Sequence, residues 1–158
     1  MNIFILDPNP ELAAIYHNDK HIVKMPLEMA QMLCTNIYYL NDLTSKAKAN
    51  KNLELVYKIF KDFPPPKSSP YPFYLFAFPN NPCTIWLRES QANMKWGLEL
   101  FRQLLIEYTF RYEKHRDLEK VYFWIRDNFP YDKIKKIELT PFVQALPETY
   151  KDEDAVKA

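Results

Sequence analysis

The sequence predicts an all-α protein: a single compact helical domain with a short N-terminal extended segment and a long ordered loop rich in proline and aromatic residues. Two observations predict this class. Apolar residues recur at helical spacing over most of the chain, and no set of segments has the pattern of a sheet. The 158-residue length and the 47% hydrophobic content suit one domain with a substantial core. We place this domain at residues 1–150 and expect a frayed tail at residues 151–158.

The first long helix is expected over about residues 10–40, after a buried extended segment at residues 3–6. Asn9 suits the N-cap, because its side chain accepts hydrogen bonds from free amides of the first turn. Pro10 suits the first helical position, where the missing amide has no cost. Pro26 lies inside this helix and predicts a kink one turn earlier, because its ring clashes with that carbonyl.

The remaining elements are expected to be helices joined by loops. In order, they are a polar loop at 41–52, a short helix at 53–63, an ordered loop at 63–82, a long helix at about 83–114, another at 117–129, and a helix start at Thr140. The segment 63–82 is too apolar for a disordered linker and too rich in proline for regular structure. We therefore expect it to pack over the domain.

Charge and glycine content exclude several classes of function. The chain has 21 Lys and Arg against 20 Asp and Glu, a formal charge of +1, so any anion recognition must be local. Gly97 is the only glycine in the sequence. Glycine-rich phosphate loops, dinucleotide-binding fingerprints and nucleophile elbows each need several glycines, so these classes are excluded.

Location follows from what the sequence lacks. No apolar run approaches the roughly 18 residues of a membrane-spanning helix, and no signal-peptide pattern is present. We expect a cytoplasmic protein with no membrane partner. Cys34 and Cys83 have no dense spacing pattern and are expected to be buried, reduced thiols.

Six polar residues share one face of the first long helix. At about 100° per residue, all six lie within about 60° of the first of them, His17, around the helix axis. The rest of the helix is largely apolar. This polar stripe consists of His17, Lys20, His21, Lys24, Glu28 and Gln31. We expect it to line a cleft or pocket, with other elements packed around the remaining circumference.

Three interpretations of the polar stripe are open. A solvated face would contain an ordinary Lys24–Glu28 pair, but two histidines and a glutamine are unusual there. His17, His21 and Glu28 have the residue types and spacing of metal ligands. Because lysines on the same face would repel a cation, we predict no metal and no other cofactor. The composition favours a phosphate-bearing ligand, with Glu28 and Lys24 as the candidate catalytic residues and the other four as ligand-binding residues.

A second polar group is expected on the helix that starts near residue 83. Glu89 and Asn93 fall on its apolar face, where a buried carboxylate needs a partner. Both a pairing with a lysine of the first helix and a catalytic role are open. Trp86 is a candidate for stacking a base, with core packing as the alternative. Gln144 lies in a C-terminal segment that either caps the cleft or only docks on the domain, and we count all four among the candidate ligand-binding residues.

Four motifs together resemble a family of small bacteriophage proteins over most of the chain. They are "MNIFILDPNPELAA", "HNDKHIVKM..E.AQ", "NNPCTIWLRES..N..W" and "TPFVQALPETY". The resemblance implies a viral protein in the host cytoplasm but no particular activity. An anti-defence role, in which the protein sequesters a host signalling nucleotide, is compatible with such an origin.

The order of elements over about the first two thirds of the chain is also similar to that of pyrimidine-dimer DNA glycosylases of the endonuclease V type. That resemblance implies an all-α enzyme that extrudes a nucleotide and attacks the sugar with its own α-amine, assisted by a glutamate of the first long helix. Carried over, the nucleophile is the amine of Met1, and the glutamate's place falls near Lys24, with Glu28 one turn on. The sequence departs from the family, because Asn2 is too large for routine removal of Met1 and Lys24 is not a carboxylate. Lys20 or Lys24 is therefore an alternative Schiff-base amine.

Three hypotheses of function follow. The first is a phage protein whose first long helix lines a nucleotide- or phosphate-binding cleft and which sequesters or processes a small nucleotide. The second is a divergent DNA glycosylase and abasic-site lyase. The third is a non-enzymatic host-interaction protein. The expected partner is a small nucleotide, which needs only an enclosed pocket, or DNA, which needs a rim of lysine and arginine.

Overall fold

The computed structural model describes residues 1–143, which form seven α-helices and one 3-10 helix, with no strand among them. The elements are α1 (Pro10–Ile15), α2 (Asp19–Leu40), α3 (Lys46–Lys51), α4 (Leu53–Ile59), α5 (Pro82–Glu89), α6 (Gln91–Tyr112), α7 (Leu118–Asn128) and η1 (Tyr131–Lys133). The all-α prediction is confirmed. Residues 144–158, including the predicted tail, lie outside the described residues. No helix begins between residues 140 and 143, so the predicted helix start at Thr140 is wrong.

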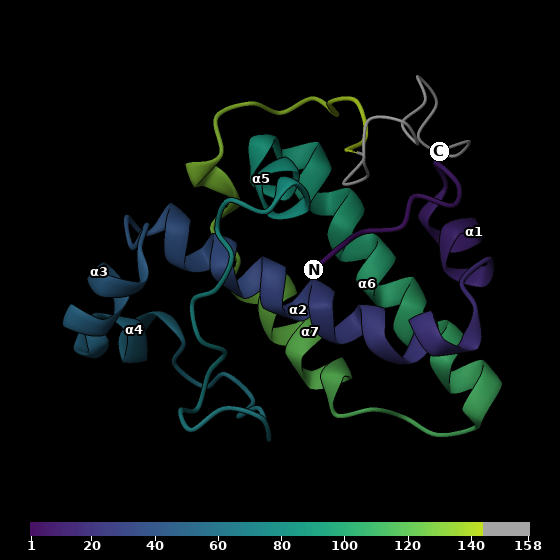
Figure 1. Ribbon diagram of the computed structural model, residues 1–158, viewed down its shortest axis with the longest axis horizontal. Helices are drawn as coiled ribbons and strands as arrows, with labels where there is room; N and C mark the ends of the chain where they lie inside the picture. Colours follow the sequence, from purple (N-terminus) through teal and green to yellow (C-terminus); the bar gives the residue numbers. More distant parts are fainter. Residues whose placement is uncertain (144–158) are drawn as a thin grey trace.

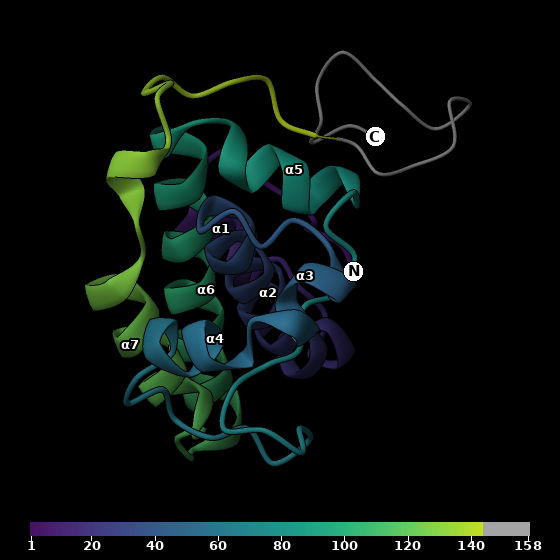
Figure 2. The ribbon, with the colours of Figure 1, turned by 90° about the vertical axis from the view of Figure 1, so that its left-hand side faces the viewer.

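The long helices α2 and α6 cross at the centre of the fold (Figures 1 and 2). Helices α5 and α7 each pack against both of them, and α1 packs along α6. Helices α3 and α4 lie together at one end of α2 (Figure 1). One hydrophobic cluster takes residues from all seven α-helices. Gly97 permits the close approach of α5 and α6, because a Cβ there would overlap the side chain of Leu87.

The predicted helix over residues 10–40 is two helices, α1 and α2, with a turn at residues 16–18 between them. Asn18 is the local cause, because its Oδ1 accepts a hydrogen bond from the amide of His21 at 2.9 Å and thereby caps a new helix. Asn9 caps α1 as predicted. Helix α2 then continues through Pro26.

The predicted helix over residues 83–114 is also two helices, because Ser90 starts a new one. Its backbone is extended, and its Oγ accepts a hydrogen bond from the amide of Asn93 at 3.0 Å. A third cap lies in the segment predicted as a polar loop, where Ser45 Oγ accepts from the amide of Lys48 at 3.1 Å and starts α3. Capping side chains therefore begin new helices at positions where helical periodicity gives no sign of a break.

The proline- and aromatic-rich segment before α5 is an ordered, non-helical stretch packed on the helices, as predicted. Phe73, Tyr74 and Phe76 are buried, and Phe73 stacks on Phe60 with ring centroids 5.6 Å apart. The hydroxyl of Tyr38 on α2 donates to the carbonyl of Tyr74 at 2.8 Å. Aromatic packing thus replaces the regular hydrogen bonding that proline prevents.

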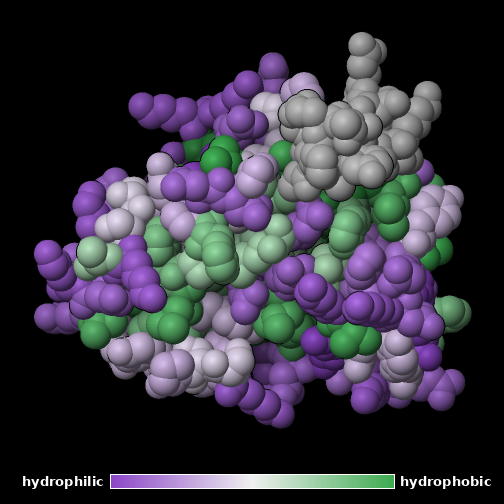
Figure 3. Space-filling model, viewed as in Figure 1, coloured by the Kyte–Doolittle hydropathy of each residue, from purple (hydrophilic) through white to green (hydrophobic). Residues whose placement is uncertain are grey.

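The surface is mixed in character. In the view of Figure 3, hydrophobic side chains lie between hydrophilic ones rather than in one uniform field. Several large hydrophobic side chains are exposed on different elements, among them Tyr16, Val23, Leu75, Phe78 and Phe110. Within residues 1–143, no helix is both long enough and apolar enough to cross a membrane.

Candidate functional site

The N-terminal segment, residues 1–6, is extended and places the first residue beside the middle of α2 (Figure 1). Ile3 and Ile5 are buried in the core, while the intervening Phe4 stacks on His21 of α2, with ring centroids 4.5 Å apart. Because side chains alternate along an extended chain, burying the two isoleucines turns Phe4 toward the helix. These contacts determine where Met1 lies.

The α-amine of Met1 lies 3.6 Å from Oε1 of Glu28 on α2. Both side chains are largely buried, with 11% and 13% of their surface exposed. The second carboxylate oxygen of Glu28, Oε2, is buried and has no hydrogen-bond partner among the described residues. The carboxylate therefore neutralises the amine with one oxygen and has the other free to accept a proton.

Two asparagines hold the first residue in place. Asn81 Nδ2 donates to the carbonyl of Met1 at 3.0 Å, and its Oδ1 accepts from the amide of Cys83 at 2.9 Å, so one side chain both caps α5 and fixes the N-terminus. Asn2 Oδ1 accepts from the thiol of Cys83 at 3.3 Å and from the amide of Ile3 at 2.8 Å. Burial is the main cause that raises the pKa of the Cys83 thiol, which therefore stays neutral and acts as a donor.

His17 is a buried, neutral residue at the junction of α1 and α2. Its Nδ1 lies 2.6 Å from the carbonyl of Ala13, which assigns the proton to Nδ1, and its Nε2 has no partner among the described residues. Burial is the largest cause that lowers its pKa, and the nearby charges of His21 and Arg111 lower it further. Within residues 1–143, no group of three His, Cys, Asp or Glu side chains is arranged to hold a metal ion.

The rest of the polar stripe is divided between surface and interior. Lys20 and Lys24 are exposed, Gln31 is half-buried, and neither lysine forms an ion pair with a described residue. The Lys24–Glu28 pair of a solvated face is not formed, since Glu28 faces the amine instead. Gln144 lies outside the described residues.

Glu89, Asn93 and Trp86 form a separate cluster around the segment that follows η1. Asn93 is fully buried. Its Nδ2 donates to the carbonyl of Trp86 at 2.8 Å and to Thr140 Oγ1 at 2.7 Å. Its Oδ1 accepts from the amide of Thr140 at 2.9 Å. The hydroxyl of Thr140 donates to Glu89 Oε2 at 3.0 Å. The buried indole of Trp86 donates to the carbonyl of Pro141 at 2.9 Å. The partners of this cluster are the 140–141 segment rather than a lysine of α2.

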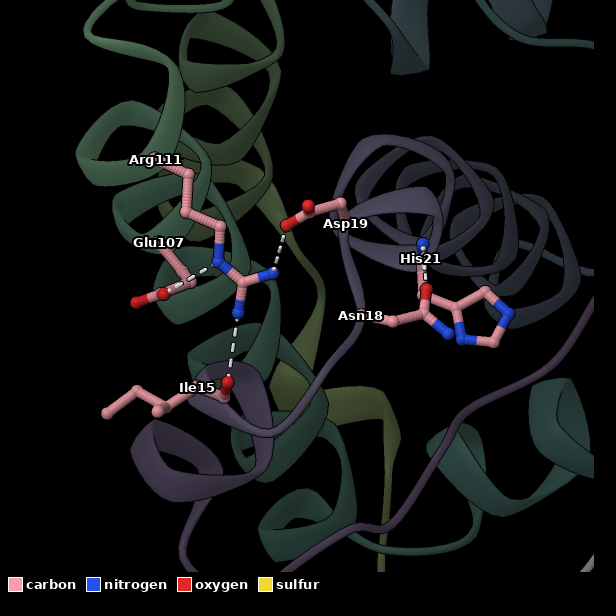
Figure 4. A network of polar contacts seen from close by, with 6 residues as sticks. All are labelled: Ile15, Asn18, Asp19, His21, Glu107 and Arg111. Carbon is pink, nitrogen blue, oxygen red and sulfur yellow. Dashed lines mark hydrogen bonds and ion pairs between the residues drawn. The ribbon is translucent and has the colours of Figure 1, made fainter.

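Arg111 of α6 organises the start of α2, a role that the sequence analysis missed. Its guanidinium donates to Glu107 at 2.8 Å, to Asp19 at 3.0 Å and to the carbonyl of Ile15 at 2.9 Å (Figure 4). It thereby ties the end of α1 and the beginning of α2 to α6. Asp19 and Ile15 are 92 and 96 residues away along the chain, and the Asn81–Met1 contact spans 80 residues, so no local pattern indicates either contact.

Comparisons with models of protein families, with curated proteins and with solved structures find no match for this chain. Function is therefore inferred from the chemistry of the site. The site places a primary amine beside a carboxylate that has one free oxygen. A primary amine forms a bond with an electrophilic carbon, and a carboxylate transfers protons.

Proposed function

We propose that this protein is a DNA glycosylase and abasic-site lyase that uses the α-amine of Met1 as nucleophile and Glu28 as acid–base group. The 3.6 Å contact between this amine and the carboxylate of Glu28 carries the proposal. Terminal residues are usually exposed and poorly ordered. The buried Oε2 of Glu28, which has no hydrogen-bond partner among the described residues, also supports it, because such atoms are rare in native structures.

The chemistry of the pair suits attack on a sugar carbon. A primary amine attacks an electrophilic carbon once it has given up its proton, and the adjacent carboxylate of Glu28 can accept that proton. The amine adds to the C1′ aldehyde of an abasic sugar, forms a C–N bond and loses water to give an iminium ion. Glu28 then takes a proton from C2′, a C2′–C3′ double bond forms, and the bond between C3′ and its phosphate oxygen breaks. With an intact nucleotide, the same attack at C1′ expels the base.

The exposed lysines of the polar stripe support binding to a phosphate backbone. Lys24 lies one turn before Glu28 on α2, and Lys20 lies one turn before Lys24. Both are exposed and have no carboxylate partner among the described residues, so their charge is available to an anion. Phosphate contacts of this kind dominate affinity for nucleic acid.

Borohydride trapping tests the proposal. The protein is incubated with a duplex that carries one abasic site, reduced, and analysed for a covalent adduct, which peptide mass spectrometry should map to Met1. The intact mass of the untreated protein establishes whether Met1 is its first residue. Glu28→Gln should lower the rate of strand cleavage about 100-fold or more, because general acid–base catalysis contributes roughly 10²–10⁴-fold.

Three lysine variants separate the nucleophile from the phosphate contacts. Lys20→Ala and Lys24→Ala should keep the adduct but weaken DNA binding and its salt dependence. Lys95→Ala, an exposed lysine on α6, is the matched control and should change neither. An adduct that maps to Lys20 or Lys24, or no adduct at low salt from folded protein, contradicts the proposal.

The exposure of Lys20 and Lys24 also favours a second function, the binding of a small nucleotide through its phosphates, with Glu28 accepting a sugar hydroxyl. This protein would then sequester the nucleotide or process it. Isothermal titration with ATP distinguishes the two functions. Binding that is lost when both lysines are replaced by alanine, and kept in Lys95→Ala, supports the second function, whereas absence of binding contradicts it.

A further inference from the structure

A cavity of about 490 Å³ lies between the proline-rich loop, α2 and the start of α7. Its apolar walls come from prolines 64–66, from Leu27 of α2, from Tyr74, and from Leu118 and Val121 of α7. The volume falls within the range of small-molecule sites in proteins, roughly 300–1,000 Å³. Rigid proline rings and the buried ring of Tyr74 form part of this wall before any ligand binds.

Arg116 is the least exposed of the charged residues that line this cavity; it is half-buried, whereas the others are exposed. One N–H donates to the carbonyl of Val23 at 2.7 Å, and the guanidinium carbon lies 4.9 Å from the ring centre of Tyr108. Within residues 1–143 it has no carboxylate partner and no second hydrogen bond. A guanidinium carries five N–H donors, so most of its hydrogen-bonding capacity is unused.

The rim of the cavity adds positive charge. Lys67 and Lys120 line it together with the single carboxylate of Asp117, which lies 3.7 Å from the amine of Lys67. Both members of this pair are highly exposed, so the pair is screened by water and easily separated. With Arg116, three cations face one anion.

We infer that this cavity binds a small molecule with an anionic group, a carboxylate or a phosphate, on an apolar body. The anionic group pairs with the unused donors of Arg116, and the body packs against the prolines and Leu27. A half-buried cation without a counter-ion gains more from an anion than an exposed one does, because water competes less. The site is separate from the Met1–Glu28 pair and does not depend on the proposed reaction.

Nuclear magnetic resonance with 2-naphthoate, and with 2-naphthylmethanol as its uncharged counterpart, tests the inference on the whole chain. We expect saturable shifts confined to amides near residues 67–69 and 116–121, and an affinity for naphthoate about tenfold or more above that for the alcohol, as one charge-assisted bond provides. Arg116→Gln should abolish this preference. Arg126→Gln is the matched control, because Arg126 also lies 4.9 Å over an aromatic ring but is exposed and paired with Asp127.

Ser68→Trp gives a second test that leaves Arg116 and its bond to Val23 intact. Ser68 is exposed on the cavity wall, so an indole there occupies the cavity without disturbing the core. It should weaken naphthoate binding about tenfold or more. Equal affinity for naphthoate and the alcohol, shifts located elsewhere, or binding unchanged in both Arg116→Gln and Ser68→Trp would overturn the inference.

Discussion

Replacing Asn93 by alanine should destabilise the protein by about 3–5 kcal/mol. The side chain is fully buried and makes three hydrogen bonds, to the carbonyl of Trp86 and to the hydroxyl and amide of Thr140. Each such bond contributes about 1 kcal/mol, which gives about 3 kcal/mol. The substitution also leaves the Trp86 carbonyl and the Thr140 amide without partners in a buried site, which raises the cost toward the upper value.

Urea unfolding followed by far-UV circular dichroism measures this loss as the difference in the free energy of unfolding. Asn128→Ala is the matched control, because Asn128 also donates to a backbone carbonyl, that of Trp124 at 2.8 Å, but is exposed on α7. The control should cost about 0.5 kcal/mol or less. A loss below about 1 kcal/mol in Asn93→Ala, or equal losses in the two variants, would refute the assignment of Asn93 as the residue that holds the 140–141 segment.

Three other predictions concern charge and burial. Burial lowers the pKa of His17 below 6.5, so the unfolded chain takes up this proton at a higher pH than the folded protein does, and the free energy of unfolding should fall as pH drops below about 6.5. In urea unfolding at several pH values, His17→Gln should flatten this dependence, whereas His115→Gln, at an exposed position, should leave it unchanged. Arg111→Ala should lower the free energy of unfolding by about 2 kcal/mol, because three hydrogen bonds are lost at the α1–α2 junction. Arg102 is exposed and paired within its own helix, so Arg102→Ala should lower it by about 0.5 kcal/mol or less. Equal urea midpoints for the two variants would contradict this prediction. The Cys83 thiol, whose pKa burial raises, should react with Ellman's reagent only after unfolding, and rapid labelling of native protein would count against its burial.

Helical periodicity predicted where helices lie better than where they end. The helix expected over residues 10–40 has apolar positions on both sides of Asn18, so its period gives no reason for a break there. The break comes from a cap that Asn18 makes and from Arg111, which ties both helix ends to α6. Ser90 interrupts the helix expected over 83–114 in the same way. A serine or asparagine within a helical pattern is compatible with either a cap or an interior position, and packing against other elements selects one.

The candidate site was predicted only in part. The periodicity placed Glu28 on the same face as His17 and the lysines, but it did not show that Glu28 faces an amine and that the lysines face solvent. The amine of Met1 entered only through a family resemblance, and Asn81, which holds it, had no visible role beyond capping α5. Arg116 and its cavity had no motif at all.

The sequence alone determined the helical class and the proline-rich loop, because these follow from local preferences of residue types and their spacing. The tertiary structure alone decided which polar groups meet. The Met1–Asn81, Asp19–Arg111 and Asn93–Thr140 contacts join residues 80, 92 and 47 positions apart, and the same side chains on isolated helices would face water. A buried polar group must find a partner wherever packing places it, so the packing of α2, α5 and α6, rather than any local pattern, sets an amine against a carboxylate.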